Sequence, residues 1–168
     1  MTIDHVLPEP LIEAAQRCAD ALLANQHTVA VAEGSCGGLV SAGLLALPGA
    51  SGYYRGGSVI YTNAALLGML NGKVERPDGL QGATEPWALH LARAAQAHVR
   101  TQWAIGEGGA AGPSGNRYGN PAGHAWVAVV GPHGYEASRH VLTGDSNRLS
   151  NMAAFAIAGL ELLADSIT

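Results

Sequence analysis

The 168-residue chain has little charge, few aromatic side chains and very little cysteine. Only 13% of its residues are charged, its formal net charge is -4, and no basic cluster occurs, which argues against a nucleic-acid partner. Glycine, proline or a charged residue interrupts every apolar run before it reaches the roughly 18 to 20 residues that a membrane helix needs. We therefore expect a soluble protein, without a membrane partner, that binds a small molecule or another subunit.

The two cysteines, Cys18 and Cys36, do not have the spacing of metal ligands, and the seven histidines are scattered along the chain. We expect neither a metal ion nor another cofactor. No secretory hydrophobic segment precedes the first predicted helix, so a reducing cytoplasm is the expected location. The low charge also favours assembly into a homo-oligomer.

What the sequence does contain is 48% hydrophobic residues and 23 glycines, a composition typical of a tightly packed, alanine-rich α/β protein. Its length suits a single domain over residues 1–168. Helical spacing of apolar residues and short β-branched runs predict the elements in chain order. The first half contains a helix at 9–25, a strand at 28–32, a helix ended by Pro48 and Gly49, and a strand at 57–62. The second half contains a short helix capped by Asn63, a long helix capped by Thr84, a strand at "QWAIG", two strands joined through "PHG", and a C-terminal helix.

This order predicts a layered α/β/α sandwich with a mixed β-sheet, because the last two strands form a local antiparallel hairpin. We expect Gly72 to end the short helix and residues 73–83 to form a loop. Residues 106–123 contain so much glycine, proline and asparagine that they predict an irregular segment. An irregular segment of this length in a small domain usually serves a binding or catalytic site.

The stretch "AVAEGSCGG" at 30–38 joins a strand to a helix through a glycine-rich turn, where backbone N–H groups gather. Ser35 is interpreted first as the N-cap of a helix that begins at Cys36, and second as a nucleophile. Cys36 is interpreted first as a small buried side chain, and second as a thiolate whose pKa the helix dipole lowers. Glu33 is interpreted first as an anchor for backbone N–H groups, and second as a general base.

Five motifs, "AEGSCGG", "GYYRGGSVIYTN", "GATEP", "AAGPSG" and "LTGDS", follow one another at the spacing of the CinA C-terminal domain family, which the chain resembles along nearly its whole length. Several members of that family are nicotinamide-nucleotide amidohydrolases. The resemblance implies hydrolysis of the carboxamide of nicotinamide mononucleotide to the acid and ammonia. In the family a serine directly after the glutamate is the nucleophile, and a lysine of the second motif assists it.

Both of these catalytic side chains are absent when the motifs are aligned without a gap. Gly34 occupies the nucleophile position and Leu66 occupies the lysine position, while the single lysine, Lys73, lies seven positions further on. Gly108 and Ser146 replace two further family side chains. The positions that still match are mostly glycines, which preserve a backbone shape rather than a reaction: Glu33, Gly37, Gly38, Gly56, Gly57, Tyr61, Asn63, Gly109, Gly112, Pro113, Gly144 and Asp145.

Matching positions and chemistry together give the candidate site. Catalytic candidates are Glu33, Ser35, Cys36 and Tyr61, with His124 and His140 as bases that a cysteine mechanism would need. Arg55 and Arg148 are the expected anion contacts, because a nucleotide-like ligand needs a cation for its phosphate. Glu107 would repel that phosphate if it faced the pocket. The ligand-binding candidates are Gly37, Gly38, Arg55, Gly57, Asn63, Gly109, Ala110, Gly112 and Arg148.

Three hypotheses follow from these residues. The leading one is a stand-alone domain of this kind whose backbone pocket binds a nucleotide-like ligand while nicotinamide mononucleotide deamidation is weak or lost. The first alternative is an amidohydrolase that acts on another small carboxamide through Ser35 or Cys36. The second alternative is a non-catalytic interaction protein that acts within an oligomer.

Overall fold

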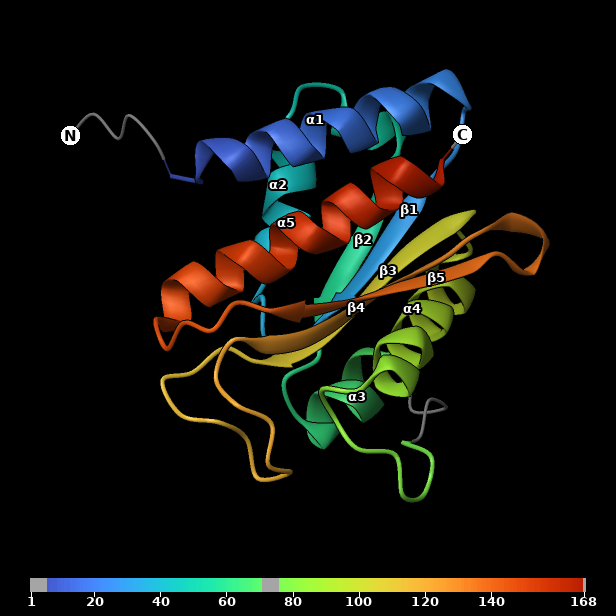
Figure 1. Ribbon diagram of the computed structural model, residues 1–168. Coiled ribbons are helices and arrows are strands. Elements are labelled where there is room, and N and C mark those ends of the chain that lie inside the picture. Colours follow the sequence, from blue (N-terminus) through green and yellow to red (C-terminus); the bar gives the residue numbers. More distant parts are fainter. Residues whose placement is uncertain (1–5, 71–75, 168) are drawn as a thin grey trace.

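Short runs of valine, alanine and glycine form a five-stranded sheet in the computed structural model, which describes residues 6–70 and 76–167 (Figure 1). β-branched and small residues suit strands that are covered on both faces. The strands lie in the order β2-β1-β3-β4-β5. Their bounds are β1 Val29–Glu33, β2 Tyr54–Val59, β3 Trp103–Ala110, β4 His124–Val130 and β5 Glu136–Leu142.

The sheet is mixed, as predicted. β1 pairs in parallel with both β2 and β3, whereas β3, β4 and β5 pair antiparallel. The predicted hairpin joins β4 to β5 through a 3-10 turn at Pro132–Gly134. Because β2, β1 and β3 run in the same direction, their carboxyl ends meet at one edge of the sheet, which is where open α/β sheets usually bind ligands.

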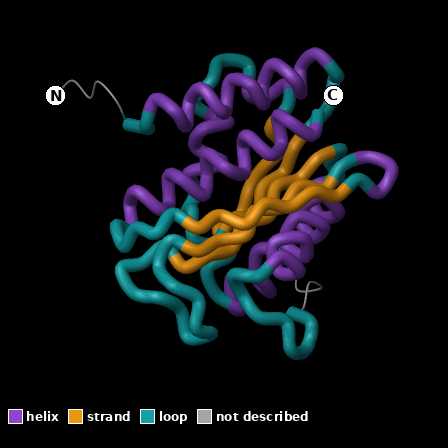
Figure 2. The backbone as a smooth tube through the Cα atoms, viewed as in Figure 1, coloured by secondary structure: helices purple, strands orange, loops and turns teal. Residues whose placement is uncertain are grey.

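Helices cover both faces of the sheet, so the predicted α/β/α sandwich is confirmed (Figures 1 and 2). Helices α1 (Glu9–Ala24), α2 (Leu39–Leu45) and α5 (Arg148–Ser166) pack on one face. Helices α3 (Asn63–Met69) and α4 (Glu85–Val99) pack on the other. Among the described residues, no helix is both long enough and apolar enough to cross a membrane.

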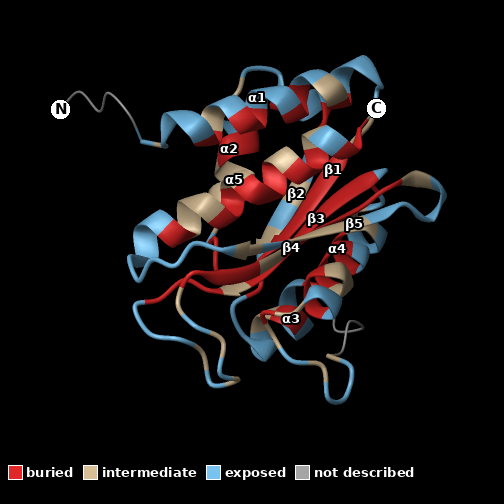
Figure 3. Ribbon diagram, viewed as in Figure 1, coloured by how far each residue is buried: buried red, intermediate tan, exposed pale blue. Residues whose placement is uncertain are grey.

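The side chains of β1, a strand that is buried along its whole length (Figure 3), belong alternately to two layers of the core. Val29 and Val31 pack in the cluster that contains residues of α1, α2 and α5, whereas Ala30 and Ala32 pack in the cluster that contains residues of α3 and α4. Gly106 of β3 also faces α4, where a Cβ atom would collide with the α4 backbone. Small residues on this face therefore allow α4 to lie close to the sheet.

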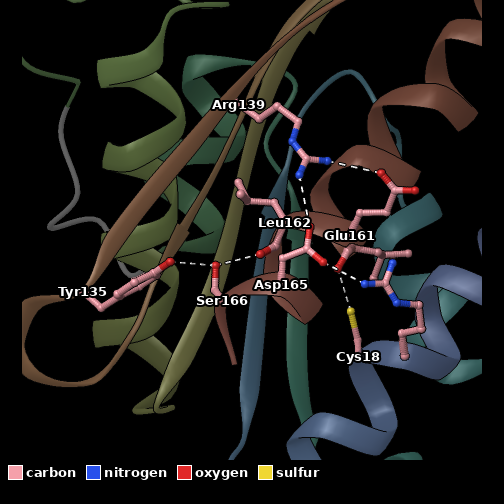
Figure 4. A network of polar contacts seen from close by, with 9 residues as sticks. Cys18, Tyr135, Arg139, Glu161, Leu162, Asp165 and Ser166 are labelled. Atoms are coloured by element: carbon pink, nitrogen blue, oxygen red, sulfur yellow. Dashed lines mark hydrogen bonds and ion pairs between the residues drawn. The ribbon is translucent and has the colours of Figure 1, made fainter. Parts of the chain in front are cut away.

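A network of polar contacts ties α5 to α1 and β5 (Figure 4). Arg139 on β5 contacts Glu161 at 3.2 Å and Asp165 at 3.3 Å, and the Cys18 thiol on α1 donates to the Leu160 carbonyl at 2.8 Å. The ion pairs are largely exposed, so we expect each to contribute less than about 1 kcal/mol. Burial raises the pKa of Cys18 to about 12, which keeps this thiol protonated.

Several predicted boundaries were wrong. The segment expected to be irregular from residue 106 belongs to β3 as far as Ala110, because its glycines pair in register with β4. The strand expected at 57–62 is Tyr54–Val59, so the segment after it is free to turn toward the edge of the sheet. Thr62, not Asn63, is the N-cap of α3, because its hydroxyl accepts a hydrogen bond from the backbone N–H three residues on at 3.1 Å. The helix end predicted at Gly72 lies outside the described residues, as do positions 73–75 of the predicted loop.

Candidate functional site

A cavity of about 530 Å³ opens at the edge where the carboxyl ends of the parallel strands meet. Its volume lies in the range of about 300 to 1,000 Å³ that is typical of small-molecule sites. Segments that are far apart in the sequence form its wall: the turn after β1 at 34–35, the segment 60–63 after β2, the start of α4 at Trp87, the glycines at 108–109 of β3, and the loop 116–118.

The turn after β1 differs from the predicted helix start. Gly37 and Gly38 have positive φ angles of 66° and 103°, a region that glycine adopts at little cost, and α2 begins only at Leu39. Gly38 is the N-cap, so the prediction that Ser35 caps a helix beginning at Cys36 was wrong. Ser35 lies instead in the turn and lines the cavity, where its side chain is 7% exposed.

Glu33 anchors this turn to the start of α2, as its first interpretation predicted. The carboxylate is fully buried. One oxygen, Oε2, accepts from the N–H groups of Gly38 and Val40 at 3.0 and 3.1 Å. The other, Oε1, accepts from the N–H and hydroxyl groups of Ser41 at 3.0 and 2.7 Å. Four donors therefore compensate this buried charge, and its oxygens are engaged away from the cavity.

Glu107 is the register partner of Glu33 on the neighbouring strand β3 and is also fully buried. Its Oε2 accepts from the N–H groups of Gly34 and Cys36 at 2.9 and 3.0 Å, while its Oε1 accepts a short hydrogen bond from the Ser35 hydroxyl. Burial raises the pKa of Glu107, and these hydrogen bonds oppose the shift in part. The carboxylate does not line the cavity wall but lies behind Ser35.

Cys36 does not have the properties of a reactive thiol. Its side chain is fully buried, and both burial and the neighbouring carboxylates Glu107 and Glu33 raise its pKa well above the ordinary value. The first interpretation, a small buried side chain, is therefore confirmed, and the second, a thiolate of lowered pKa, was wrong, because the thiol is desolvated and lies before α2 rather than in its first turn. His124 and His140 contact each other at 2.9 Å, and His124 Nε2 lies 2.8 Å from a backbone carbonyl, so both ring nitrogens of His124 are engaged elsewhere.

The predicted ligand contacts are only partly brought together. Tyr61, Asn63 and Gly109 line the cavity with Ser35. Arg55 donates instead to a backbone carbonyl at 2.9 Å, and Arg148 donates to the Gly112 carbonyl at 2.8 Å. Neither arginine reaches the cavity wall, so the structure does not support their assignment as its anion contacts. The remaining candidates also lie off the cavity wall: Glu33, Cys36, Gly37, Gly38, Gly57, Ala110 and Gly112.

A basic and aromatic group on the wall was not predicted from the sequence. The Arg76 guanidinium lies 4.9 Å from the Trp87 ring centroid, and Arg76 Nη2 and Arg117 Nη2 lie 3.2 and 2.8 Å from the Tyr118 hydroxyl. The hydrogen bond from Arg117, helped by Arg76, lowers the pKa of Tyr118. Two guanidinium groups therefore favour negative charge at this point. The available signal was "NRYGN", a cation and an aromatic residue within the irregular segment.

Leu66, which the motif spacing aligns with the family's lysine, lies where a charged base would be costly. Leu66 on α3 is 1% exposed and packs among apolar side chains under α4. Lys73, the single lysine, lies outside the described residues. Within residues 6–70 and 76–167, no three histidine, cysteine, aspartate or glutamate side chains are grouped so that they could hold a metal ion.

Comparison with known proteins agrees with the motifs. The sequence model of the CinA C-terminal domain matches residues 12–167. A CinA-like protein of Anaeromyxobacter sp. (strain K) is 37% identical over 143 residues, which are 85% of this chain and 35% of that protein. A CinA-like protein of Prochlorococcus marinus (strain MIT 9313) is 37% identical over 71% of this chain and 28% of its own length. The chain thus spans about a third of the curated relatives that it matches.

Solved structures show the same fold. The competence/damage inducible protein of Agrobacterium tumefaciens superimposes with a TM-score of 0.86 at 27% identity, covering 98% of each chain. A CinA superfamily protein of Klebsiella pneumoniae superimposes with a TM-score of 0.85 at 23% identity, covering 94% of this chain and 97% of its own. By family model, sequence and fold, the chain belongs to the CinA C-terminal domain family.

Proposed function

We propose that the cavity binds a small nucleotide-like molecule through its anionic group, and that deamidation of nicotinamide mononucleotide by this chain is weak or lost. The observation that carries the proposal is the convergence of Arg76 and Arg117 on one point of a cavity that Trp87 also lines. Guanidinium groups bind phosphate through charge-assisted hydrogen bonds, and an aromatic face suits a planar base.

The loss of the ordinary reaction rests on two positions. Gly34 carries no hydroxyl, and Leu66 is an apolar side chain in a closed core. The family's mechanism uses a serine hydroxyl and a lysine, and these two positions supply neither. Arg76 and Arg117, which we propose to bind the phosphate, are separate from both positions, so binding can persist without the reaction that is typical of the family's hydrolases.

The test is calorimetric titration of the purified chain with nicotinamide mononucleotide. Arg117 is the sharper probe, because its side chain is exposed and donates a hydrogen bond to Tyr118 on the cavity wall. Arg117→Gln should weaken binding by about tenfold or more, since a hydrogen bond to a charged group contributes about 1.5 to 3 kcal/mol. Arg55→Gln is the matched control, because that exposed arginine lies off the cavity wall.

Unchanged affinity in Arg117→Gln, or an equal loss in Arg55→Gln, would contradict the assignment of the phosphate to this arginine pair. Ammonia release from the same nucleotide, measured in parallel, should stay near that of a protein-free blank. A turnover typical of an active amidase would overturn the second half of the proposal. A second function, hydrolysis of a different carboxamide, is favoured by one contact, the hydrogen bond between Ser35 and Glu107.

A further inference from the structure

Two buried glutamates lie side by side, Glu33 at the end of β1 and Glu107 within β3, and each accepts a hydrogen bond from a serine hydroxyl. Glu33 binds Ser41, which lies within α2 and not on the cavity wall. Glu107 binds Ser35, which does line the cavity. Anchoring a turn explains the first arrangement completely. It does not explain why the second places a hydroxyl at the cavity surface with a carboxylate behind it.

We propose that Ser35 and Glu107 form a nucleophile and general-base pair that acts, in the same cavity, on a carboxylic ester or on a carboxamide other than that of nicotinamide mononucleotide. The pair replaces the serine and lysine of the family with a serine one position later and a carboxylate from another strand. This inference rests on the proposed function only in that the acyl compound occupies the same cavity.

The contacts of Glu107 divide its two oxygens between two tasks. The N–H groups of Gly34 and Cys36 both bind Oε2 and fix the carboxylate in place, which leaves Oε1 directed at the Ser35 hydroxyl. A general base must lie within hydrogen-bond reach of the proton that it removes, and Oε1 meets that condition. Burial also raises the pKa of Glu107, which makes its ionised form a stronger base than an exposed glutamate.

The neighbouring strand β3 leaves room beside the Ser35 hydroxyl. Gly109 lies against Ser35, and a Cβ atom there would be 2.8 Å from Ser35 Oγ. Both Gly109 and Ser35 line the cavity. The absence of a side chain at Gly109 therefore keeps the space beside the hydroxyl open, so a planar acyl group can approach Oγ from the cavity.

The reaction balances with these two side chains and water. Glu107 Oε1 takes the Ser35 proton as Oγ bonds to the carbonyl carbon, and the carbonyl electron pair moves onto oxygen. When the tetrahedral intermediate collapses, the C–N or C–O bond breaks, and Glu107 passes its proton to the leaving nitrogen or oxygen. Water then attacks the acyl ester on Ser35, Glu107 accepts its proton and returns it to Oγ, and the carboxylic acid departs.

The test uses p-nitrophenyl acetate, with nitrophenolate release followed by absorbance and acetylation of the protein followed by intact mass. The wild type should show a burst and one acetyl group on Ser35, which Ser35→Ala should abolish. Glu107→Gln should slow acetylation by about 100-fold or more, since general-base catalysis contributes about 10² to 10⁴. Ser41→Ala is the matched control, because it removes the hydroxyl from the neighbouring carboxylate and should leave the burst unchanged.

The pH profile separates a base from a structural support. Acetylation by the wild type should rise as Glu107 ionises, and the profile of Glu107→Gln should lack that rise. The titratable side chains that face Glu107 are Glu33 and Cys36, and the Cys36 thiol stays protonated because its pKa is raised well above the ordinary value. A Glu107→Gln profile that keeps the rise, with a circular dichroism spectrum like that of the wild type, would overturn the assignment of Glu107.

Equal acetylation of wild type and Ser35→Ala, or no acetylation of the wild type, would overturn the proposal as a whole. That outcome is distinguishable from failure of the proposed ligand, because nucleotide binding is measured separately by calorimetry and depends on Arg117. Ser35→Ala should bind nicotinamide mononucleotide as the wild type does. Acetylation at Ser35 without nucleotide binding would support the Ser35–Glu107 pair and contradict the proposal that the cavity binds a nucleotide.

Discussion

Replacing each of the two buried glutamates by glutamine should have very different effects on stability. The Glu33 carboxylate accepts four hydrogen bonds, two on each oxygen. Glutamine has one oxygen and one NH₂ group. With the oxygen in the place of Oε2, the NH₂ group can donate to the Ser41 hydroxyl, but it faces the Ser41 N–H group, which is also a donor. Because a buried donor left without an acceptor costs about 1 to 3 kcal/mol, Glu33→Gln should lower the free energy of unfolding by about that amount.

In Glu107 the same substitution keeps every contact. The amide oxygen can take the place of Oε2 and accept from Gly34 and Cys36, and the NH₂ group can donate to the Ser35 hydroxyl, which rotates to become the acceptor. The substitution also removes a buried charge. Glu107→Gln should therefore change the free energy of unfolding by less than about 1 kcal/mol.

The assay is urea denaturation at pH 7, followed by circular dichroism, on both variants and the wild type. A loss of about 1 to 3 kcal/mol would be a measurable part of the roughly 5 to 15 kcal/mol that stabilises a domain of this size. Equal losses in the two variants would refute the reasoning, because it depends on how donors are distributed over the two carboxylates rather than on burial alone.

Two further predictions concern protonation. The raised pKa of Glu107 favours the folded state below the ordinary glutamate value of 4.5, and this contribution is lost as the pH rises through the raised pKa. As the pH rises from 4.5 through the raised pKa of Glu107, the unfolding free energy of the wild type should therefore fall relative to that of Glu107→Gln. Urea denaturation at several pH values measures this difference, and a difference that does not change with pH would contradict the raised pKa. Cys18 and Cys36 are both fully buried and both have raised pKa values. Ellman's reagent should therefore label neither thiol in the native protein and both thiols in urea. Rapid labelling of Cys36 in the native protein would contradict its burial.

Much of the fold followed from local pattern. The strand at Val29–Glu33, the helix capped by Thr84 and the β4–β5 hairpin were predicted close to their observed bounds, because each has a strong period or a clear start signal. Predictions that depended on a single boundary were less accurate. The turn at 34–38 is longer than expected, because Glu33 draws the first N–H groups of α2 onto its own carboxylate.

Family motifs located the region of the site but not all of its contacts. Tyr61 and Asn63 match the family pattern and line the cavity, whereas Arg55 and Arg148 lie near motifs in the sequence but bind backbone carbonyls elsewhere. Arg117 belongs to no motif, and only loop geometry carries it to the wall. Which cation reaches a cavity depends on how loops fold over the edge of the sheet, and spacing along the chain does not encode that path.

The sequence by itself determined the α/β class and the family, because composition, periodicity and motif spacing are properties of the chain alone. The tertiary structure decided which side chains meet. Glu107 is 72 residues from Ser35 along the chain, and the parallel pairing of β1 with β3 places its carboxylate against that hydroxyl. A hydrogen bond between two such distant residues depends on strand order and register, which no local pattern specifies.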